Sequence, residues 1–169
     1  MKKPWTGRLF GSRNFWLCAM SAHQHGHPRL ANGIRAVNSL LYHNSLPVKA
    51  TVASDVQLAH HGIGTVIHHK VRIASGVKIC QNVTIAVRPS RGGSNGIFVD
   101  ENVLIGANSV IITPRNEDIR IGKGAKIAAG AVVIEDVPPG ATMVGNPARV
   151  ATKRASTAPS PEPAAAQSN

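Results

Sequence analysis

The sequence predicts an all-β parallel β-helix, and the main observation behind this is an aliphatic residue at every sixth position between residues 60 and 151. A period of six fits neither an α-helix, with about 3.6 residues per turn, nor a simple strand, which alternates every two residues. It is typical of a coiled β-solenoid in which three hexads complete a turn. About four coils fit. The hexad positions are Ile67, Ile73, Ile79, Ile85, Val99, Ile105, Ile111, Ile121, Ile127 and Val133.

Two further observations support this fold. Aromatic residues make up only 4% of the 169 residues, which suits a narrow interior filled by stacked Ile and Val. Small residues recur where the coils should turn, and glycine and asparagine tolerate the positive φ that tight corners can require. These corner residues are Gly76, Asn82, Gly106, Asn108, Gly122, Gly124 and Gly130.

The first 47 residues form a separate region ahead of the hexads. Residues 1–28 are basic and rich in Gly, Ser and His, so we predict an irregular arm. Its alternating histidines at 23, 25 and 27 fit a flexible loop better than a metal-binding tract. Residues 29–43 carry apolar side chains at helical spacing, which predicts a short amphipathic helix. Such a helix would cover the apolar open end of the solenoid and its unpaired strand edges.

The predicted solenoid domain extends from residue 48 to residue 151. Its first segment, 48–60, is extended, with Val48, Val52, Val56 and Leu58 as candidates to point inward. Two prolines after Val137 end the regular hexads, because proline cannot continue a β-ladder. Residues 144–151 are expected to form a closing strand. The remaining segment, 152–169, is rich in Pro, Ser and Ala and is predicted to be a disordered tail.

Charge and cysteine content limit the partners and the compartment. The net charge is +11, and no acidic residue occurs before Asp55. Because no nucleic-acid motif accompanies this charge, a phosphate-rich cofactor or a solvated surface explains it better. The two cysteines form no CxxC pair, which favours the reducing cytoplasm. No apolar stretch approaches transmembrane length. We therefore expect a cytoplasmic protein that binds neither nucleic acid nor membranes.

Two interruptions of the hexads mark where function should concentrate, because loops held by a rigid scaffold commonly carry it. Fourteen residues separate Ile85 from Val99, and this step contains a Gly/Ser loop with Arg88 and Arg91. Ten residues separate Ile111 from Ile121. The second insertion is most simply a longer corner.

Several motifs together resemble the hexapeptide-repeat acyltransferases. They are the hexads, the segment His61-Gly62-Ile63-Gly64-Thr65-Val66-Ile67, the loop after Val83-Thr84-Ile85, and the ending IAAGAVVIEDVPPGATMVGNPARV. The resemblance covers about residues 55–151 and is closest to the serine O-acetyltransferase branch. It implies a left-handed parallel β-helix, a homotrimer with active sites between subunits, and acetyl-CoA as co-substrate.

The resemblance also implies a mechanism in which a histidine acts as the general base. The histidine accepts the proton of a hydroxyl group as the oxygen attacks the acetyl-CoA thioester, and its pKa near neutrality suits this task. Backbone N–H groups would stabilise the developing oxyanion. The motif places His61 in this role, while His60 and His68 remain alternatives.

Further site residues are carried over or suggested by position. Ala107 and Ala129 match positions whose backbone contacts the pantetheine arm of acetyl-CoA, although small residues are needed at solenoid corners in any case. Arg149 and Lys153 are candidate phosphate partners by charge and position alone. The residues of the substrate loop are Arg88, Arg91 and Asn95. No metal site is expected.

Two departures from the family pattern leave the acceptor open. Asn95 and Gly96 stand where serine O-acetyltransferases carry an Arg-His pair that holds the amino acid, and His60 replaces the acidic residue that orients the base. Serine is therefore the first candidate acceptor and a sugar or polysaccharide hydroxyl the second. A zinc enzyme with three histidines is disfavoured because no histidine follows His69. A non-catalytic binding module remains a further alternative.

Overall fold

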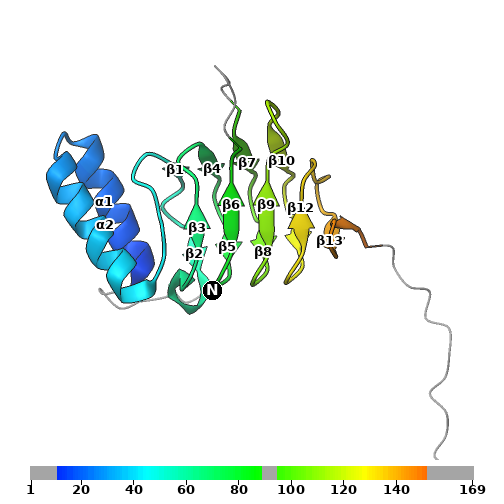
Figure 1. The fold of residues 1–169 in the computed structure, drawn as a ribbon, viewed down its shortest axis with the longest axis horizontal. Helices are drawn as coiled ribbons and strands as arrows, with labels where there is room; N and C mark the ends of the chain where they lie inside the picture. Colours follow the sequence, from blue (N-terminus) through cyan, green and yellow to red (C-terminus); the bar gives the residue numbers. More distant parts are fainter. Residues whose placement is uncertain (1–10, 89–94, 152–169) are drawn as a thin grey trace, which may run out of the picture.

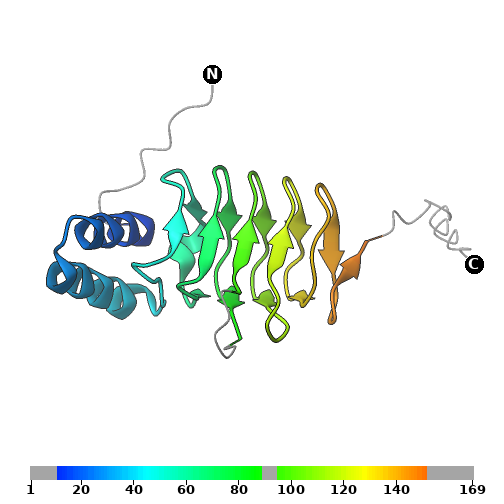
Figure 2. The same cartoon turned by 90° about the horizontal axis from the view of Figure 1, so that it is seen from above.

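The computed structural model describes residues 11–88 and 95–151. They form a parallel β-solenoid of about four turns, with two helices at its N-terminal end (Figure 1). Seen from above, the coils stack in register from β1 to β13, and the helices lie beyond the first coil (Figure 2). The predicted β-helix is therefore confirmed. Within the described ranges, no helix is long and apolar enough to cross a membrane.

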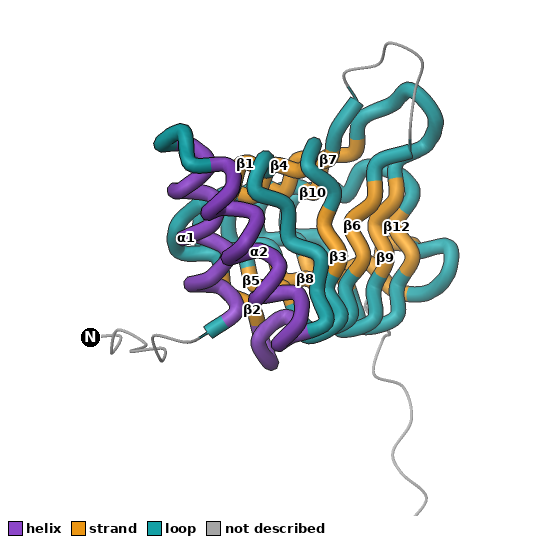
Figure 3. Tube along the Cα trace, turned by 60° about the vertical axis from the view of Figure 1, so that its left-hand side comes forward, coloured by secondary structure: helices purple, strands orange, loops and turns teal. Residues whose placement is uncertain are grey.

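Each coil contributes one short strand to each of three sheets, which Figure 3 shows in an oblique view along the solenoid. Sheet 1 has the order β1 (Thr51–Val52), β4 (Val71–Ile73), β7 (Ile97–Val99) and β10 (Ile119–Ile121). Sheet 2 has the order β2 (Gln57–Leu58), β5 (Lys78–Ile79), β8 (Leu104–Ile105), β11 (Lys126–Ile127), β13 (Thr142–Val144) and β14 (Arg149–Val150). Sheet 3 has the order β3 (Val66–Ile67), β6 (Thr84–Ala86), β9 (Val110–Ile112) and β12 (Val132–Val133).

The register between coils shows where residues are inserted. Val66 pairs with Thr84, 18 residues later, which is the length of a regular coil. Ile97 lies 26 residues after its partner Val71, and Ile119 lies 22 residues after Ile97. These two longer steps match the two predicted interruptions. A third insertion was missed: Leu58 and Ile67 face inward on successive sheets but are nine residues apart rather than six, and the extra residues lie in η1 (Ala59–Gly62).

Stacked aliphatic side chains fill the solenoid, and all ten residues predicted at the hexad positions are buried. Removing each such side chain from water contributes about 1.5–3 kcal/mol. In the first coil, Val56 and Leu58 are buried as predicted, whereas Val48 and Val52 are only half-buried. The core therefore accounts for the period of six in the sequence.

The predicted corner residues serve two different purposes. Five of them have positive φ, as expected: Gly76, Asn82, Asn108, Gly124 and Gly130. Gly106 and Gly122 do not have positive φ; they are small because the next coil passes against them. A Cβ atom would lie 2.6 Å from the nitrogen of Ala129 at Gly106, and 2.5 Å from the nitrogen of Pro139 at Gly122.

The predicted irregular arm is wrong for most of its described part, which forms α1 (Ser12–Gln24). Trp16, Ala19 and Met20 are buried, and Trp16 and Met20 belong to the core cluster of the solenoid. The indole nitrogen of Trp16 donates a hydrogen bond to the carbonyl of Pro47 at 2.9 Å. These apolar residues recur at helical spacing, so the signal was present in the sequence.

The second helix, α2 (Pro28–Tyr42), confirms the helix predicted at residues 29–43. Its expected role as the cover of the solenoid is wrong, because α1 supplies the buried apolar side chains at this end. The α2 helix packs on α1 and keeps four large apolar side chains exposed: Leu30, Val37, Leu40 and Leu41.

The opposite end closes with a hairpin. β14 pairs antiparallel with β13. The closing strand predicted at residues 144–151 is shorter than expected, because only Arg149–Val150 form β14 and Val144 belongs to β13. The predicted tail, residues 152–169, lies outside the described residues.

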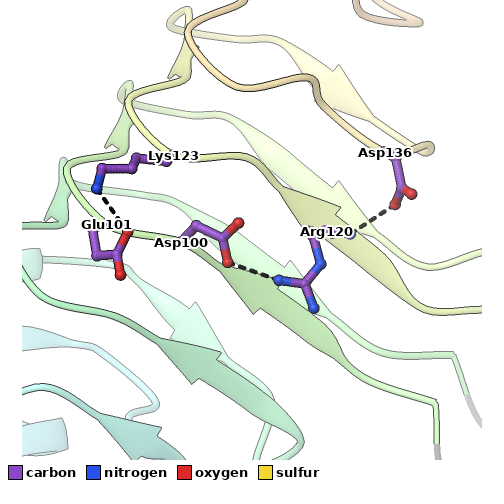
Figure 4. Close-up of polar contacts among 5 residues, drawn as sticks. All are labelled: Asp100, Glu101, Arg120, Lys123 and Asp136. Atoms are coloured by element: carbon purple, nitrogen blue, oxygen red, sulfur yellow. Dashed lines mark hydrogen bonds and ion pairs between the residues drawn. The ribbon is translucent and has the colours of Figure 1, made fainter.

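Polar contacts on and beside sheet 1 connect neighbouring coils (Figure 4). Arg120 forms an ion pair with Asp100 at 3.0 Å, and its backbone N–H donates to Asp136 at 2.7 Å. Lys123 pairs with Glu101 at 3.5 Å. Because these groups are largely exposed, each ion pair contributes little to stability.

Candidate active site

The corner between sheets 2 and 3, here called the 2–3 corner, brings together predicted site residues from separate coils. It contains His61 in the first coil, Ala107 in the third and Ala129 in the fourth. Backbone hydrogen bonds link the successive turns of this corner, for example from the N–H of Gly130 to the carbonyl of Ala107 at 2.8 Å. The three residues therefore lie along one edge of the solenoid.

The histidine loop projects from this corner on the inserted residues of η1. His60, His61 and Gly62 have consecutive φ values of 49°, 59° and 60°. A left-handed conformation costs roughly 1–2 kcal/mol at a residue with a side chain, and such strain clusters at functional sites. Both histidine side chains are exposed. The insertion thus places His61 outside the regular coil, whereas its position one hexad before Ile67 would otherwise point it inward.

Two features hold this loop in place. The N–H of Ile63 donates to the carbonyl of His60 at 3.3 Å, and the N–H of Thr65 donates to the carbonyl of Gly62 at 3.1 Å. Gly62 is buried against Leu58, where an added Cβ atom would lie 3.1 Å from a methyl carbon. The loop is therefore a defined turn that presents two imidazoles to solvent.

The ring of Tyr42, at the end of α2, stacks on the ring of His61. Their centroids are 5.3 Å apart and the planes are inclined by 29°. Within the described ranges, the His61 ring makes no hydrogen bond and no ion pair. Sequence reasoning missed the contact with Tyr42, because no periodicity connects two residues 19 positions apart.

The corner between sheets 3 and 1, here called the 3–1 corner, holds the two described residues of the predicted substrate loop, Arg88 and Asn95. The Asn95 side chain is buried and donates to the carbonyl of Arg88 at 3.1 Å, across the base of the long loop. The backbone N–H of Arg88 donates to the hydroxyl oxygen of Thr113 at 2.9 Å. Arg91 lies outside the described residues. Sheet 3 separates these groups from His61 by the length of a strand, roughly 10 Å at about 3.3 Å per residue.

The alternative base His68 also lies at the 3–1 corner. Burial lowers the pKa of its imidazole from the ordinary value of 6.5, and the neighbouring His69 and Lys70 lower it further. Its Nδ1 atom accepts a hydrogen bond from the backbone N–H of Lys70 at 3.2 Å. His68 is therefore a neutral imidazole near pH 7, on a different edge from Ala107 and Ala129.

The candidate phosphate partners lie near the C-terminal hairpin. The side chain of Arg149 is exposed and forms an ion pair with Glu135 at 3.1 Å. It also donates a hydrogen bond to the carbonyl of Ala148. A phosphate would have to compete with Glu135 for this guanidinium. Lys153 lies outside the described residues. In the described part of the chain, no three His, Cys, Asp or Glu side chains are placed to hold a metal ion.

Comparison with known proteins connects this geometry to a family. No family model matches the chain. The serine acetyltransferase of Escherichia coli K12 is 34% identical over 151 residues, which cover 84% of this chain and 53% of that protein. The chain is a serine acetyltransferase-like hexapeptide-repeat protein.

Solved structures agree with this assignment. Soybean serine acetyltransferase complexed with serine superimposes with a TM-score of 0.72 at 29% identity, over 83% of this chain and 56% of that chain. A serine acetyltransferase in complex with CoA gives a TM-score of 0.71 at 27% identity, over the same shares of the two chains. The present chain thus spans about half the length of the relatives it matches.

Proposed function

We propose that this protein is an acetyl-CoA-dependent O-acetyltransferase in which His61 is the general base. The observation that supports this most directly is that His61, Ala107 and Ala129, which are far apart in the sequence, lie on one edge of the solenoid. Relatives crystallised with serine and with CoA support the two substrates. A cytoplasmic location accords with this chemistry.

In the proposed reaction, the neutral imidazole of His61 accepts the proton of the acceptor hydroxyl as its oxygen attacks the thioester carbonyl carbon. The C–O bond forms, and collapse of the tetrahedral intermediate breaks the C–S bond. The imidazolium returns the proton to the departing sulfur, which yields an acetyl ester and CoA thiol. Backbone N–H groups along the 2–3 corner are candidates for stabilising the oxyanion. Small side chains at Ala107 and Ala129 leave the backbone open to the pantetheine arm.

We further propose that the active form is a homotrimer with sites between subunits. The outer face of sheet 3 is apolar and partly exposed, and its outward residues are Val66, Thr84, Ala86, Val110, Ile112 and Val132. The His61 loop flanks one edge of this face, and Arg88 and Asn95 flank the opposite edge. Packing of sheet 3 against a neighbouring chain would bring Arg88 and Asn95 of one subunit toward the histidine of another.

Serine is the first candidate acceptor, and a sugar or polysaccharide hydroxyl is the second. The second candidate is favoured by the structure around Asn95, which is buried and anchors its own loop, so it is poorly placed to contact an amino acid.

The test uses the purified 169-residue chain, acetyl-CoA and a thiol-detecting dye, with serine, homoserine and simple sugars as acceptors. We expect CoA release with at least one hydroxyl acceptor, and His61→Ala to abolish it while acetyl-CoA binding and oligomeric state are unchanged. The matched controls His60→Ala and His68→Ala should retain turnover. Full activity of His61→Ala would refute the assigned base. A chain that does not bind acetyl-CoA would favour the alternative of a non-catalytic solenoid.

A further inference from the structure

The N-terminal helices reach the candidate active site through one aromatic contact. Tyr42 is the last residue of α2, and its ring covers one side of the His61 imidazole at a centroid distance of 5.3 Å. Aromatic rings at this separation and in an offset arrangement attract each other by about 0.5–1.5 kcal/mol beyond the burial of their area. The base loop therefore has a partner from a different part of the fold.

Backbone pairing fixes this contact in register. The N–H of Gly64 donates to the carbonyl of Tyr42 at 3.2 Å. Three residues further on, the N–H of Ser45 donates to Thr65 at 2.9 Å, and its carbonyl accepts from Ile67 at 3.0 Å. The segment leaving α2 is thus hydrogen-bonded to the segment leaving the histidine loop. Tyr42 cannot shift along the loop without breaking these bonds.

His61 needs such a partner because its own surroundings constrain the ring very little. It is exposed on a left-handed turn, and within the described ranges no carboxylate contacts it. An unrestrained imidazole would sample several rotamers, and only some of them would point a ring nitrogen at an acceptor hydroxyl.

We propose that Tyr42 is a positioning residue that orients the imidazole of His61 for acetyl transfer. This inference rests on the proposed function. It assigns the helical region a direct role in turnover, beyond covering the end of the solenoid. It also predicts that a variant that keeps the aromatic ring at this position keeps the orientation of His61.

Three variants test the proposal. Tyr42→Phe keeps the ring, Tyr42→Leu keeps apolar bulk without a ring, and Leu41→Ala alters the neighbouring exposed residue as a matched control. For each variant, kcat and the KM for acetyl-CoA are measured. The His61 ring protons are followed by NMR and assigned with His61→Gln. We expect Tyr42→Leu to lower kcat roughly 2- to 12-fold, the factor equivalent to the stacking energy, with KM unchanged. Tyr42→Phe and Leu41→Ala should resemble the wild type.

The NMR signal separates positioning from general structural support. The Tyr42 ring current should shift the His61 protons upfield in the wild type and in Tyr42→Phe, and the shift should vanish in Tyr42→Leu. If Tyr42→Leu loses the shift but keeps the wild-type kcat, the proposal is overturned and the acetyl-transfer function is untouched. Equal losses in Tyr42→Leu and Leu41→Ala would also overturn it. A wild type that acetylates no acceptor overturns the proposed function itself, and with it this proposal.

Discussion

Replacing Gly106 with alanine should reposition the 2–3 corner at the place where we propose that acetyl-CoA binds. Gly106 immediately precedes Ala107, and the next coil passes directly over it. An added Cβ atom would lie 2.6 Å from the nitrogen of Ala129 and 2.8 Å from the carbonyl oxygen of Ile127. Because these neighbours are backbone atoms, no side-chain rotation can relieve the clash. The fourth coil has to move away from the third.

The size of the effect follows from the cost of overpacking. Forcing an extra carbon into a close-packed interior costs about 1–3 kcal/mol. For a domain of this size, each kcal/mol shifts the melting temperature by about 2–4 °C, so Gly106→Ala should melt about 2–12 °C below the wild type. Displacement of Ala107 relative to Ala129 should also weaken acetyl-CoA binding by about tenfold, the equivalent of about 1.4 kcal/mol.

Gly122→Ala is the matched control. Its added Cβ atom would lie 2.5 Å from the nitrogen of Pro139, so the clash is of similar severity, but it lies on the corner between sheets 1 and 2. Circular dichroism gives the melting temperature of both variants, and isothermal titration calorimetry gives their affinity for acetyl-CoA. Both variants should lose stability, and only Gly106→Ala should lose affinity. Equal affinities in the two variants would refute the cofactor assignment, and an unchanged melting temperature would refute the close approach.

Three further predictions address the core, the assembly and the response to pH. Ile85→Ala removes a fully buried side chain from the stack and should lower the free energy of unfolding by about 2–5 kcal/mol in urea titrations; a loss below 1 kcal/mol would contradict its central position. Val132→Asp, on sheet 3, should dissociate the proposed trimer in size-exclusion chromatography with light scattering, while Leu104→Asp, on the outer face of sheet 2, should not. The reverse pattern would place the subunit interface on sheet 2 instead of sheet 3. The pKa of His68 is lowered in the folded chain, so below about pH 6.5 the unfolded chain binds more protons than the folded chain. The contribution of His68 to stability is therefore lost as the pH falls from about 6.5 toward the pKa of His68 in the folded chain. His68→Gln should therefore lose less stability than the wild type between about pH 7 and 5, and parallel curves would argue against burial of the ring.

The period of six identified the fold because side chains that stack on one another must be similar from coil to coil. Ile79, Ile105 and Ile127 occupy equivalent places on sheet 2, and each contacts the preceding coil through paired backbone. The same rule explains why the two longer insertions were visible as gaps. A gap is only seen between two regular stretches, however. The insertion at η1 was missed because it precedes Ile67, the first residue of the regular stretch.

The first helix was missed for a different reason. Its buried side chains, Trp16, Ala19 and Met20, lie among Ser, Asn and His residues, and the composition of the segment suggested an irregular arm. Their spacing was helical, but helix formation here depends on packing against the first coil, a tertiary effect that local composition does not report. The contact between Tyr42 and His61 has the same origin, because the register between α2 and the loop exists only in the folded chain.

The loop residues Asn95 and Gly96 show how the structure changes the meaning of a departure from the family pattern. The sequence alone left it open whether the chain had simply lost an Arg-His pair from an otherwise suitable pocket. In the structure, the Asn95 side chain holds the carbonyl of Arg88, and the N–H of Gly96 donates to Asp118 at 2.7 Å. A Cβ atom at Gly96 would lie 2.7 Å from the carbonyl oxygen of Lys70.

These two positions therefore support the base of the loop, and they have no room for the larger pair. The double variant Asn95→Arg/Gly96→His would break the contact with Arg88 and push a side chain into the backbone of the preceding coil. We expect it to melt below the wild type, by at least the 2–4 °C that corresponds to about 1 kcal/mol, and its serine-dependent CoA release should not exceed that of the wild type. Asn95→Ala, which removes the same hydrogen bond without adding bulk, separates the two contributions. If the double variant keeps the wild-type melting temperature and gains serine turnover, the loop is a substrate pocket that has merely lost its side chains, and the structural role argued for Asn95 and Gly96 is wrong.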